Sequence, residues 1–486
     1  MENATSPDGE IHNGVAHSLL ITGDKNKDLR AQYSWTLFEF ARTPYVGLVF
    51  IFAFAPYFSN IVVGDPVRGQ ELWSLANTIA GFCVGLFAPL LGAIVDRMGR
   101  RKPWIVAVVA VMIPGCLSLW FAMPGAQGGL PIVVITLIIG MLVVAFEFGQ
   151  VFHNSLLPYL IKPEGVGWLS GRGIAMGNVG AFLATVFLLF GVALPSSGDF
   201  ISSFIPDKPV FGLDTANYEH DRIVGPLCGL WFFIFTIPFI LWTPDHKPTS
   251  VSLVRATKEG LGQLWQTVKQ ARKMSNVGLY LIARMLYNDG MVAIQAYSGI
   301  VAAGVFKWSL PELMCFAISL APFTIGGGFL CGWLDKVMGT KRTIQLSVIG
   351  TCIFALGAVS ITPASIFFIP YDPASAGPIW SFPYFQTLPE IMFIVMYMGL
   401  ALMITVAFAQ SRAMMARISP ISMMSQFFGL YSVSGWATAF LGHGMVAFFT
   451  RVSKNQQIGF SSLILLMLFA FILLTWVREE RAEDIL

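Results

Sequence analysis

Gly-Ala-Ile-Val-Asp-Arg-Met-Gly-Arg-Arg-Lys, residues 92–102, joins two apolar runs at about 71–95 and 103–123. Each run is long enough to cross a bilayer as a helix. Gly92 would let a neighbouring helix approach closely, and Gly99 suits the tight turn. Asp96 can neutralise part of the basic cluster that follows it, which comprises Arg97, Arg100, Arg101 and Lys102. Because retained loops carry the excess of Lys and Arg, we expect this turn on the cytoplasmic face.

The composition is that of a membrane protein, with 55% hydrophobic and 12% charged residues among 486. An ordinary soluble domain is about a quarter charged. No nucleophile–base pair, metal-ligand spacing, phosphate loop or basic groove with aromatic platforms occurs in the soluble segments. We therefore expect no enzyme activity, no cofactor or metal, and no nucleic-acid partner. The six cysteines lie inside apolar runs without a C-x-x-C pair, as buried apolar residues would.

Twelve apolar segments are predicted to be transmembrane helices. They lie at 33–58, 71–95, 103–123, 131–158, 168–194, 223–243, 276–305, 312–334, 342–362, 389–411, 423–449 and 458–477. The predicted organisation is a cytoplasmic tail (1–32), a six-helix bundle (33–243), a cytoplasmic linker (244–275), a second six-helix bundle (276–477) and a cytoplasmic tail (478–486). The linker has apolar residues at helical spacing beside lysines and arginines, which indicates an amphipathic helix on the inner leaflet.

The distribution of basic residues supports this topology. With both termini inside, the cytoplasmic segments hold about 21 Lys and Arg, and the outer loops hold about 6. We therefore predict an integral multi-pass protein, in the cytoplasmic membrane of a bacterium.

The second half repeats the loop of the first in degenerate form. Asp335, Lys336, Gly339, Lys341 and Arg342 follow the eighth segment, with one extra residue before the glycine and Cys331 in place of Gly92. A repeat at six-helix spacing predicts two pseudo-symmetric bundles with a site between them near the midplane.

The pattern Gly-x-x-x-Asp-Arg-x-Gly-Arg-Arg resembles the loop between helices 2 and 3 of the major facilitator superfamily. The resemblance implies an all-α membrane protein of twelve transmembrane helices in two pseudo-symmetric bundles, working as a monomer by alternating access.

Several ionisable residues lie inside the apolar segments, where they are costly and usually functional. Arg42, Glu147 and Asp289 fall near the midplane, and Glu39 can pair with Arg42 three residues on. Burial favours the protonated form of a carboxyl group, so Glu147 and Asp289 are candidates for proton coupling, with His153 as a relay. Three further arginines are predicted to form structural ion pairs, namely Arg172, Arg284 and Arg412.

Longer motifs resemble a narrower family. They include 35–45, 99–104, 151–158, 170–177, 281–290, 409–420 and 427–442. These stretches are similar to the bacterial permeases related to the fungal vacuolar amino-acid effluxers linked to autophagy. The resemblance implies roles for residues of the fourth, seventh and tenth helices, among them Asn154, Arg284, Tyr287, Asn288, Asp289, Gln410 and Arg412.

The first helix departs from the family pattern. Phe38, Glu39, Arg42 and Thr43 stand where Tyr, Asp, Asn and Ser are usual, so the presumed site gains a cation. A guanidinium suits a carboxylate or phosphate, which favours an anionic or zwitterionic organic substrate; alternatively, Arg42 only neutralises Glu39. The residues predicted to bind substrate are Glu39, Arg42, Gln150, Asn154, Tyr287, Asn288 and Gln410.

The predicted function is secondary active transport of a small polar organic solute, an amino acid or organic anion, with proton coupling. Two alternatives stay open: a sugar or glycoside cation symporter, and a non-transporting receptor or lipid-handling protein on a transporter scaffold. The predicted partners are a small-molecule substrate, a proton and the lipid bilayer.

Overall fold

A computed structural model describes residues 20–193, 210–214, 216–249, 251–269, 275–306, 308, 310–372, 377–380, 384–436, 439–453 and 456–480. Most of the predicted terminal tails, at residues 1–19 and 481–486, lie outside this range. The long helices are α1 (Lys25–Pro44), α3 (Pro66–Met98), α4 (Lys102–Ser118), α5 (Ile132–Leu156), α6 (Val166–Leu188), α9 (Val224–Trp242), α10 (Leu253–Lys269), α11 (Ser275–Phe306), α12 (Leu310–Met338), α13 (Thr340–Val359), α14 (Leu388–Ile418), α15 (Met424–Trp436), α16 (Ala439–Ser453) and α17 (Gln456–Trp476).

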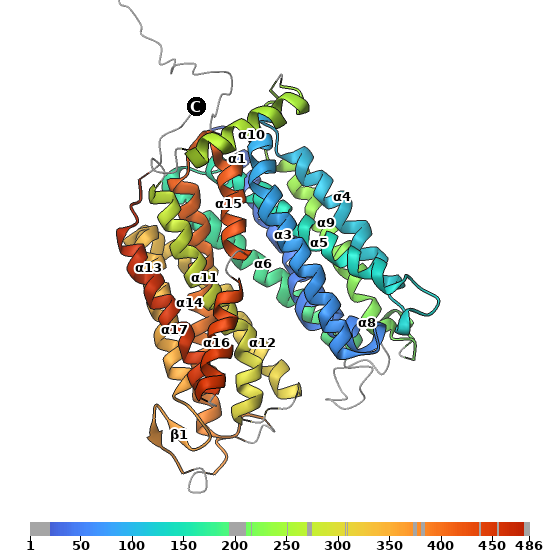
Figure 1. The fold of residues 1–486 in the computed structure, drawn as a ribbon, viewed down its shortest axis with the longest axis vertical. Coiled ribbons are helices and arrows are strands. Elements are labelled where there is room, and N and C mark those ends of the chain that lie inside the picture. Colours follow the sequence, from blue (N-terminus) through green and yellow to red (C-terminus); the bar gives the residue numbers. More distant parts are fainter. Residues whose placement is uncertain are drawn as a thin grey trace, which may run out of the picture.

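Ten helical stretches in the described chain are long and apolar enough to span a membrane. The remaining two predicted segments correspond to α11, which carries Arg284 and Asp289, and to the pair α15 and α16. Both run alongside the other helices of their half (Figure 1). The fold is therefore an all-α membrane protein, and its helices are consistent with the predicted twelve.

The helices pack in two groups (Figure 1). The N-bundle comprises α1, α3, α4, α5, α6 and α9, and the C-bundle comprises α11 to α17. The groups touch where α3 and α5 meet α15, and where α6 meets α12 and α14. The short hairpin of β1 (Ser365–Ile366) and β2 (Ile369–Pro370) lies at the end of the molecule opposite to α10. We call these two ends the α10 end and the β1 end.

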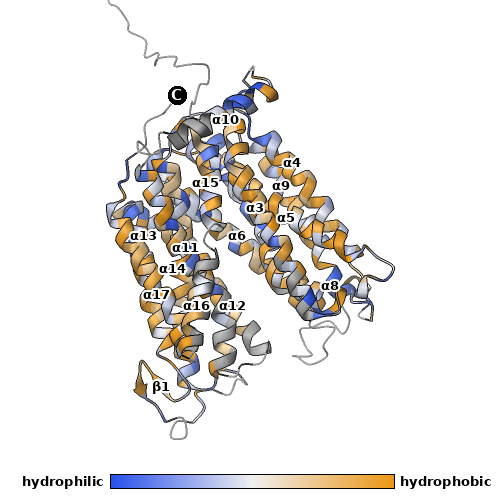
Figure 2. Ribbon diagram, in the orientation of Figure 1, coloured by the Kyte–Doolittle hydropathy of each residue, from blue (hydrophilic) through white to orange (hydrophobic). Residues whose placement is uncertain are grey.

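Figure 2 shows that apolar residues cover the length of the helices, and that polar residues gather at α8 (Glu219–Arg222), along α10 and at the ends of the bundles. This distribution fits a bilayer around the bundles, because lipid tails require an apolar surface on spanning helices.

The first helix shows how the sequence shapes a spanning segment. Asp24 caps α1 by accepting hydrogen bonds from the backbone N–H groups of Asn26 (3.0 Å) and Lys27 (3.4 Å). Pro44 ends the regular helix because it lacks a backbone donor, and the chain continues in wider π-helical turns at Tyr45–Phe52.

Two glycines make the turns that the loop motif predicts. Gly99, between α3 and α4, has φ +79°, and Gly339, before α13, has φ +83°. L side chains rarely adopt these values, so glycine is required there. The linker contains α10, which lies across the end of the molecule opposite to the hairpin (Figure 1). Its residues Leu253 and Val254 are exposed.

Close packing of α6 on α1 generates a stability prediction. A side chain at Gly180 of α6 would overlap the backbone carbonyl of Phe40 in α1. We expect Gly180→Val to destabilise the purified protein by about 1–3 kcal/mol, the usual cost of overpacking, measured as a lower melting temperature. Gly85→Val in α3, where a Cβ meets nothing within 4 Å, is the control. An equal loss in both variants would contradict this account.

Candidate functional site

The predicted loop motif joins the two bundles at the α10 end. The carboxylate of Asp96 in α3 accepts hydrogen bonds from the backbone N–H groups of Ser425 (3.1 Å) and Gln426 (3.0 Å), at the start of α15. A carboxylate stabilises a helix N-terminus in this way. Arg101 donates to the same carboxylate (2.9 Å). A side chain at Gly92 would overlap the carbonyl of Ser425, so the glycine lets α3 and α15 touch.

The repeated motif makes a matching contact between α12 and α6. Asp335 lies against Gly167 in the first turn of α6, and it accepts hydrogen bonds from Thr340 (2.7 Å) and Arg417 (2.8 Å). Arg417 also donates to the carbonyl of Pro163 in the N-bundle (3.1 Å). The guanidinium that pairs with Asp335 therefore comes from α14 and not from the loop that follows Asp335.

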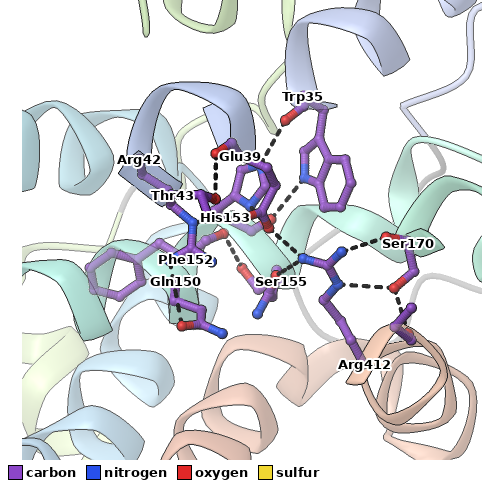
Figure 3. A network of polar contacts seen from close by, with 12 residues as sticks. Trp35, Glu39, Arg42, Thr43, Gln150, Phe152, His153, Ser155, Ser170 and Arg412 are labelled. Atoms are coloured by element: carbon purple, nitrogen blue, oxygen red, sulfur yellow. Dashed lines mark hydrogen bonds and ion pairs between the residues drawn. The ribbon is translucent and has the colours of Figure 1, made fainter. Parts of the chain in front are cut away.

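A cluster of charged side chains also joins the two bundles (Figure 3). Glu39 of α1, 3% exposed, forms a 2.8 Å ion pair with Arg42 on the next turn of its own helix. It also forms an ion pair with Arg412 of α14, which belongs to the opposite bundle. We call Glu39, Arg42 and Arg412 the charge cluster.

Arg412 makes four hydrogen bonds with the N-bundle. Its Nε donates to the Ser170 hydroxyl (2.9 Å), and its Nη2 donates to the Ser170 carbonyl (2.6 Å). Its Nη1 donates to Asn154 Oδ1 (3.1 Å) and to Glu39. Arg412 lies just after the predicted segment 389–411, and α14 continues past it to Ile418, so this residue lies more than one turn inside the helix.

His153 is enclosed beside the charge cluster. Its ring stacks on Trp35 (centroids 4.3 Å apart) and on Phe38 (4.7 Å). Its Nε2 lies 3.0 Å from the Trp35 carbonyl oxygen, and its Nδ1 lies 3.5 Å from Glu39 Oε1. The predicted relay residue is therefore fully buried and lies next to Glu39, one of the predicted substrate residues.

A cavity of about 170 Å³ lies between the bundles and is lined by Glu147, Gln150, Arg284, Asn288, Tyr431, Ser432 and Gly435. Glu147 and Gln150 come from α5, whereas the other residues come from α11 and α15. The cavity thus combines a carboxylate from one bundle with a guanidinium from the other. Gln150 also connects it to the charge cluster, since Arg42 Nη1 lies 3.4 Å from Gln150 Oε1.

Arg284 is held in the cavity wall by α15. Its Nη1 donates to the Tyr431 carbonyl (2.8 Å) and to the Ser434 hydroxyl, and its guanidinium lies 3.5 Å from the centre of the Tyr431 ring. Its Nε is buried and has no hydrogen-bond partner among the residues that the structure describes. Both of its hydrogen bonds go to neutral oxygens rather than to a carboxylate, so its charge is available to a bound anion.

Other predicted residues lie inside the bundles. The Tyr287 hydroxyl is 2.5 Å from Ser411 Oγ, and Gln410 Nε2 donates to the Cys331 carbonyl (3.0 Å). Asp289 accepts from the backbone N–H of Gly442 (2.7 Å). These three contacts join helices of the C-bundle and lie away from the cavity wall.

Arg172 differs from its predicted role. Its guanidinium lies over the ring of Tyr33 (3.5 Å), and no ion pair of Arg172 occurs among the described residues. A cation over an aromatic face is stabilised by the ring quadrupole, which replaces the expected carboxylate.

Residue-by-residue reasoning missed several members of these sites, including Ser170, Arg417, Tyr431, Ser432 and Gly435. All five fall inside the motifs at 170–177, 409–420 and 427–442. The family motifs therefore include these five residues, whereas the spacing of charges along single helices did not identify them.

Residues 167–484 match the profile of the family described as vacuole effluxer Atg22 like, and residues 21–162 match that of MFS/sugar transport proteins. An uncharacterised MFS-type transporter of Bacillus subtilis, YxiO, is 21% identical over 94% of this chain and 96% of its own. Autophagy-related protein 22 of Yarrowia lipolytica is 22% identical over 65% of this chain, and the match spans 51% of the fungal protein.

Solved structures share the fold. The transporter FucP in its outward conformation superposes with a TM-score of 0.67 at 11% identity, covering 93% of this chain and 98% of FucP. The human organic anion transporter MFSD10 superposes with a TM-score of 0.63 at 11% identity, and the match covers 92% of this chain and 99% of MFSD10. The overall arrangement is therefore that of major facilitator transporters.

The charge cluster generates a second stability prediction. Glu39→Gln leaves two buried guanidinium groups without their shared carboxylate, and we expect a loss of about 3–5 kcal/mol, measured by thermal unfolding. The control is Glu259→Gln in α10, which removes an exposed ion pair with Arg255 and should leave the melting temperature unchanged. The double variant Glu39→Gln/Arg412→Gln should lose less than the two single losses added together. If the loss in the double variant equals the sum of the two single losses, Glu39 and Arg412 do not stabilise each other.

Proposed function

We propose that this chain, which belongs to the family of Atg22-like vacuole effluxers within the major facilitator superfamily, is a secondary active transporter of amino acids. It moves a small zwitterionic solute across the membrane by alternating exposure of one central site.

The cavity between the bundles is the observation that carries this proposal. An amino acid presents an ammonium group and a carboxylate a few ångströms apart. Glu147 suits the ammonium group and Arg284 suits the carboxylate, while Gln150 and Asn288 supply neutral hydrogen-bonding groups. Because these residues come from opposite bundles, a bound solute would contact both of the parts that move in alternating access.

Arg42, the cation predicted to bind the substrate, does not take that role in the proposed site. Arg42 is paired with the carboxylate of Glu39, whereas Arg284 lines the cavity and donates hydrogen bonds to neutral oxygens, so Arg284 takes the anion-binding role. The family description of an effluxer agrees with a transport function.

We also propose that the α10 end faces the cytoplasm of a bacterial cell and that the protein works as a monomer. The loops predicted to lie inside hold most of the lysines and arginines. The charge cluster and both loop motifs join the bundles in this half of the molecule, which supports a state closed at the α10 end, and with the proposed orientation this end is the cytoplasmic one.

Proton coupling is assigned to Glu147. It lies in the cavity wall, where a solute's ammonium group would compete with a proton for the carboxylate. Asp289 is not among the residues that line the cavity, and its carboxylate accepts a hydrogen bond from the backbone N–H of Gly442.

A sugar symporter is the second candidate, because the first third of the chain matches a family described as MFS/sugar transport proteins. A neutral sugar would use the amide groups and Ser432 of the cavity, and it would not need the charges of Glu147 and Arg284.

A binding measurement separates the two candidates. We expect the amino acids, tested one by one, to raise the melting temperature of the purified protein, since ligands that bind the native state stabilise it. Arg284→Gln and Glu147→Gln should each weaken this binding at least tenfold, whereas Arg172→Gln on α6, outside the cavity wall, should not. Stabilisation by neutral sugars that survives both cavity substitutions would favour the sugar symporter.

Transport in liposomes tests the coupling residue. For the wild type, we expect an imposed proton gradient to drive accumulation of the amino acid that binds. Glu147→Gln cannot exchange a proton, so it should lose gradient-driven accumulation but keep exchange of labelled for unlabelled solute at solute concentrations raised to compensate for its weaker binding. Gradient-driven accumulation by Glu147→Gln would assign the proton to another residue.

A further inference from the structure

Arg412 is bound entirely by the opposite bundle. The acceptors of its hydrogen bonds are Ser170, Asn154 and Glu39, which belong to α6, α5 and α1 of the N-bundle. When the bundles separate at the α10 end, the guanidinium of Arg412 leaves all of these partners together. The cation is 3% exposed in the closed state, so it must then find a new anion or water.

Glu39 does not face the same loss. Its second cation, Arg42, lies on the same helix at 2.8 Å and moves with it. After separation the N-bundle therefore keeps a neutral pair, and the uncompensated charge remains on the C-bundle at Arg412.

The other arginine of α14 provides the contrast. Arg417 also touches the N-bundle, at the carbonyl of Pro163, but it is paired with Asp335 of its own bundle at 2.8 Å. Arg417 therefore keeps a carboxylate when the bundles separate, whereas no carboxylate of the C-bundle contacts Arg412 in the described chain.

We infer that Arg412 is an anion site of the state open at the α10 end, where the carboxylate of a solute takes the place that Glu39 occupies in the closed state. This inference rests on the proposed transport function. A planar guanidinium binds a carboxylate with two parallel hydrogen bonds, so the incoming anion reproduces the lost interaction. The solute then moves from Arg412 toward Arg284 as closure returns Glu39 to Arg412.

The route between the two arginines is marked by existing contacts. Gln150 lines the cavity that contains Arg284, and it accepts a hydrogen bond from Arg42 of the charge cluster. Arg412 and Arg284 thus lie at the two ends of one polar path, which crosses from the α10 end to the central cavity.

Opening of the α10 end can be measured by the distance between two spin labels. Lys162 and Lys336 are exposed at this end, one in each bundle, and each is replaced by a labelled cysteine after the six native cysteines are exchanged for serine or alanine. The probes are alanine, propionate (no ammonium group) and ethylamine (no carboxylate). Since a ligand shifts the population toward the state it binds better, alanine and propionate should increase the long-distance population, and ethylamine should not.

Arg412→Gln and Arg417→Gln form the matched pair. Both remove a contact across the α10 end, so both should raise the long-distance population without ligand. Arg412→Gln should in addition need at least tenfold more propionate for the same response, whereas Arg417→Gln should need no more propionate than the unsubstituted labelled protein does. An unchanged propionate response in Arg412→Gln would overturn the inference.

Two other outcomes separate the inference from the proposed function. If alanine raises the melting temperature in an Arg284-dependent way but no carboxylate opens the α10 end, the central site stands and the role of Arg412 is wrong. If no amino acid binds at all, the proposed function fails, and the inference that rests on it fails as well.

Discussion

A buried carboxylate that stays ionised in an apolar membrane protein needs a cation beside it, and the carboxylate of Glu39 has two, one from each bundle. Arg42 compensates the charge within α1, and Arg412 reaches it from the other bundle. The first pair belongs to the fold of the N-bundle, and the second depends on how the bundles meet. The same side chain therefore connects the stability of one bundle to the conformation of the whole molecule.

The contacts made by Asp96 and Asp335 show that the internal repeat has a physical meaning. In each half, an aspartate at the end of one helix lies against the start of a helix in the other half, with glycine where the backbones touch. The cations differ, since Arg101 follows Asp96 in the loop, whereas Arg417 reaches Asp335 from α14. Both halves thus place an aspartate against a helix of the opposite half, but the cation that pairs with the aspartate comes from the loop in one half and from α14 in the other.

The sequence predicts features that depend on neighbouring residues, and it predicts less about features that depend on distant ones. The apolar segments, the glycine turns and the pair of Glu39 with Arg42 follow from local spacing. The partner of Arg412 lies 373 positions away, so no spacing rule could identify it. The stacking of Arg284 on Tyr431 likewise depends on how α11 packs on α15. Arg172 shows that a cation need not pair with a carboxylate, because the ring of Tyr33 contacts its guanidinium instead.

The two elements outside the bundles have a consequence for the surrounding lipid. Val254 of α10 is 82% exposed at one end of the molecule, and Phe368 of the hairpin is 69% exposed at the other. Apolar side chains at such positions settle at the boundary between hydrocarbon and headgroups. Because α10 packs on α3 of the N-bundle and the hairpin lies between α13 and α14 of the C-bundle, the two anchors belong to different bundles. Rocking of one bundle against the other would therefore displace one membrane anchor relative to the other.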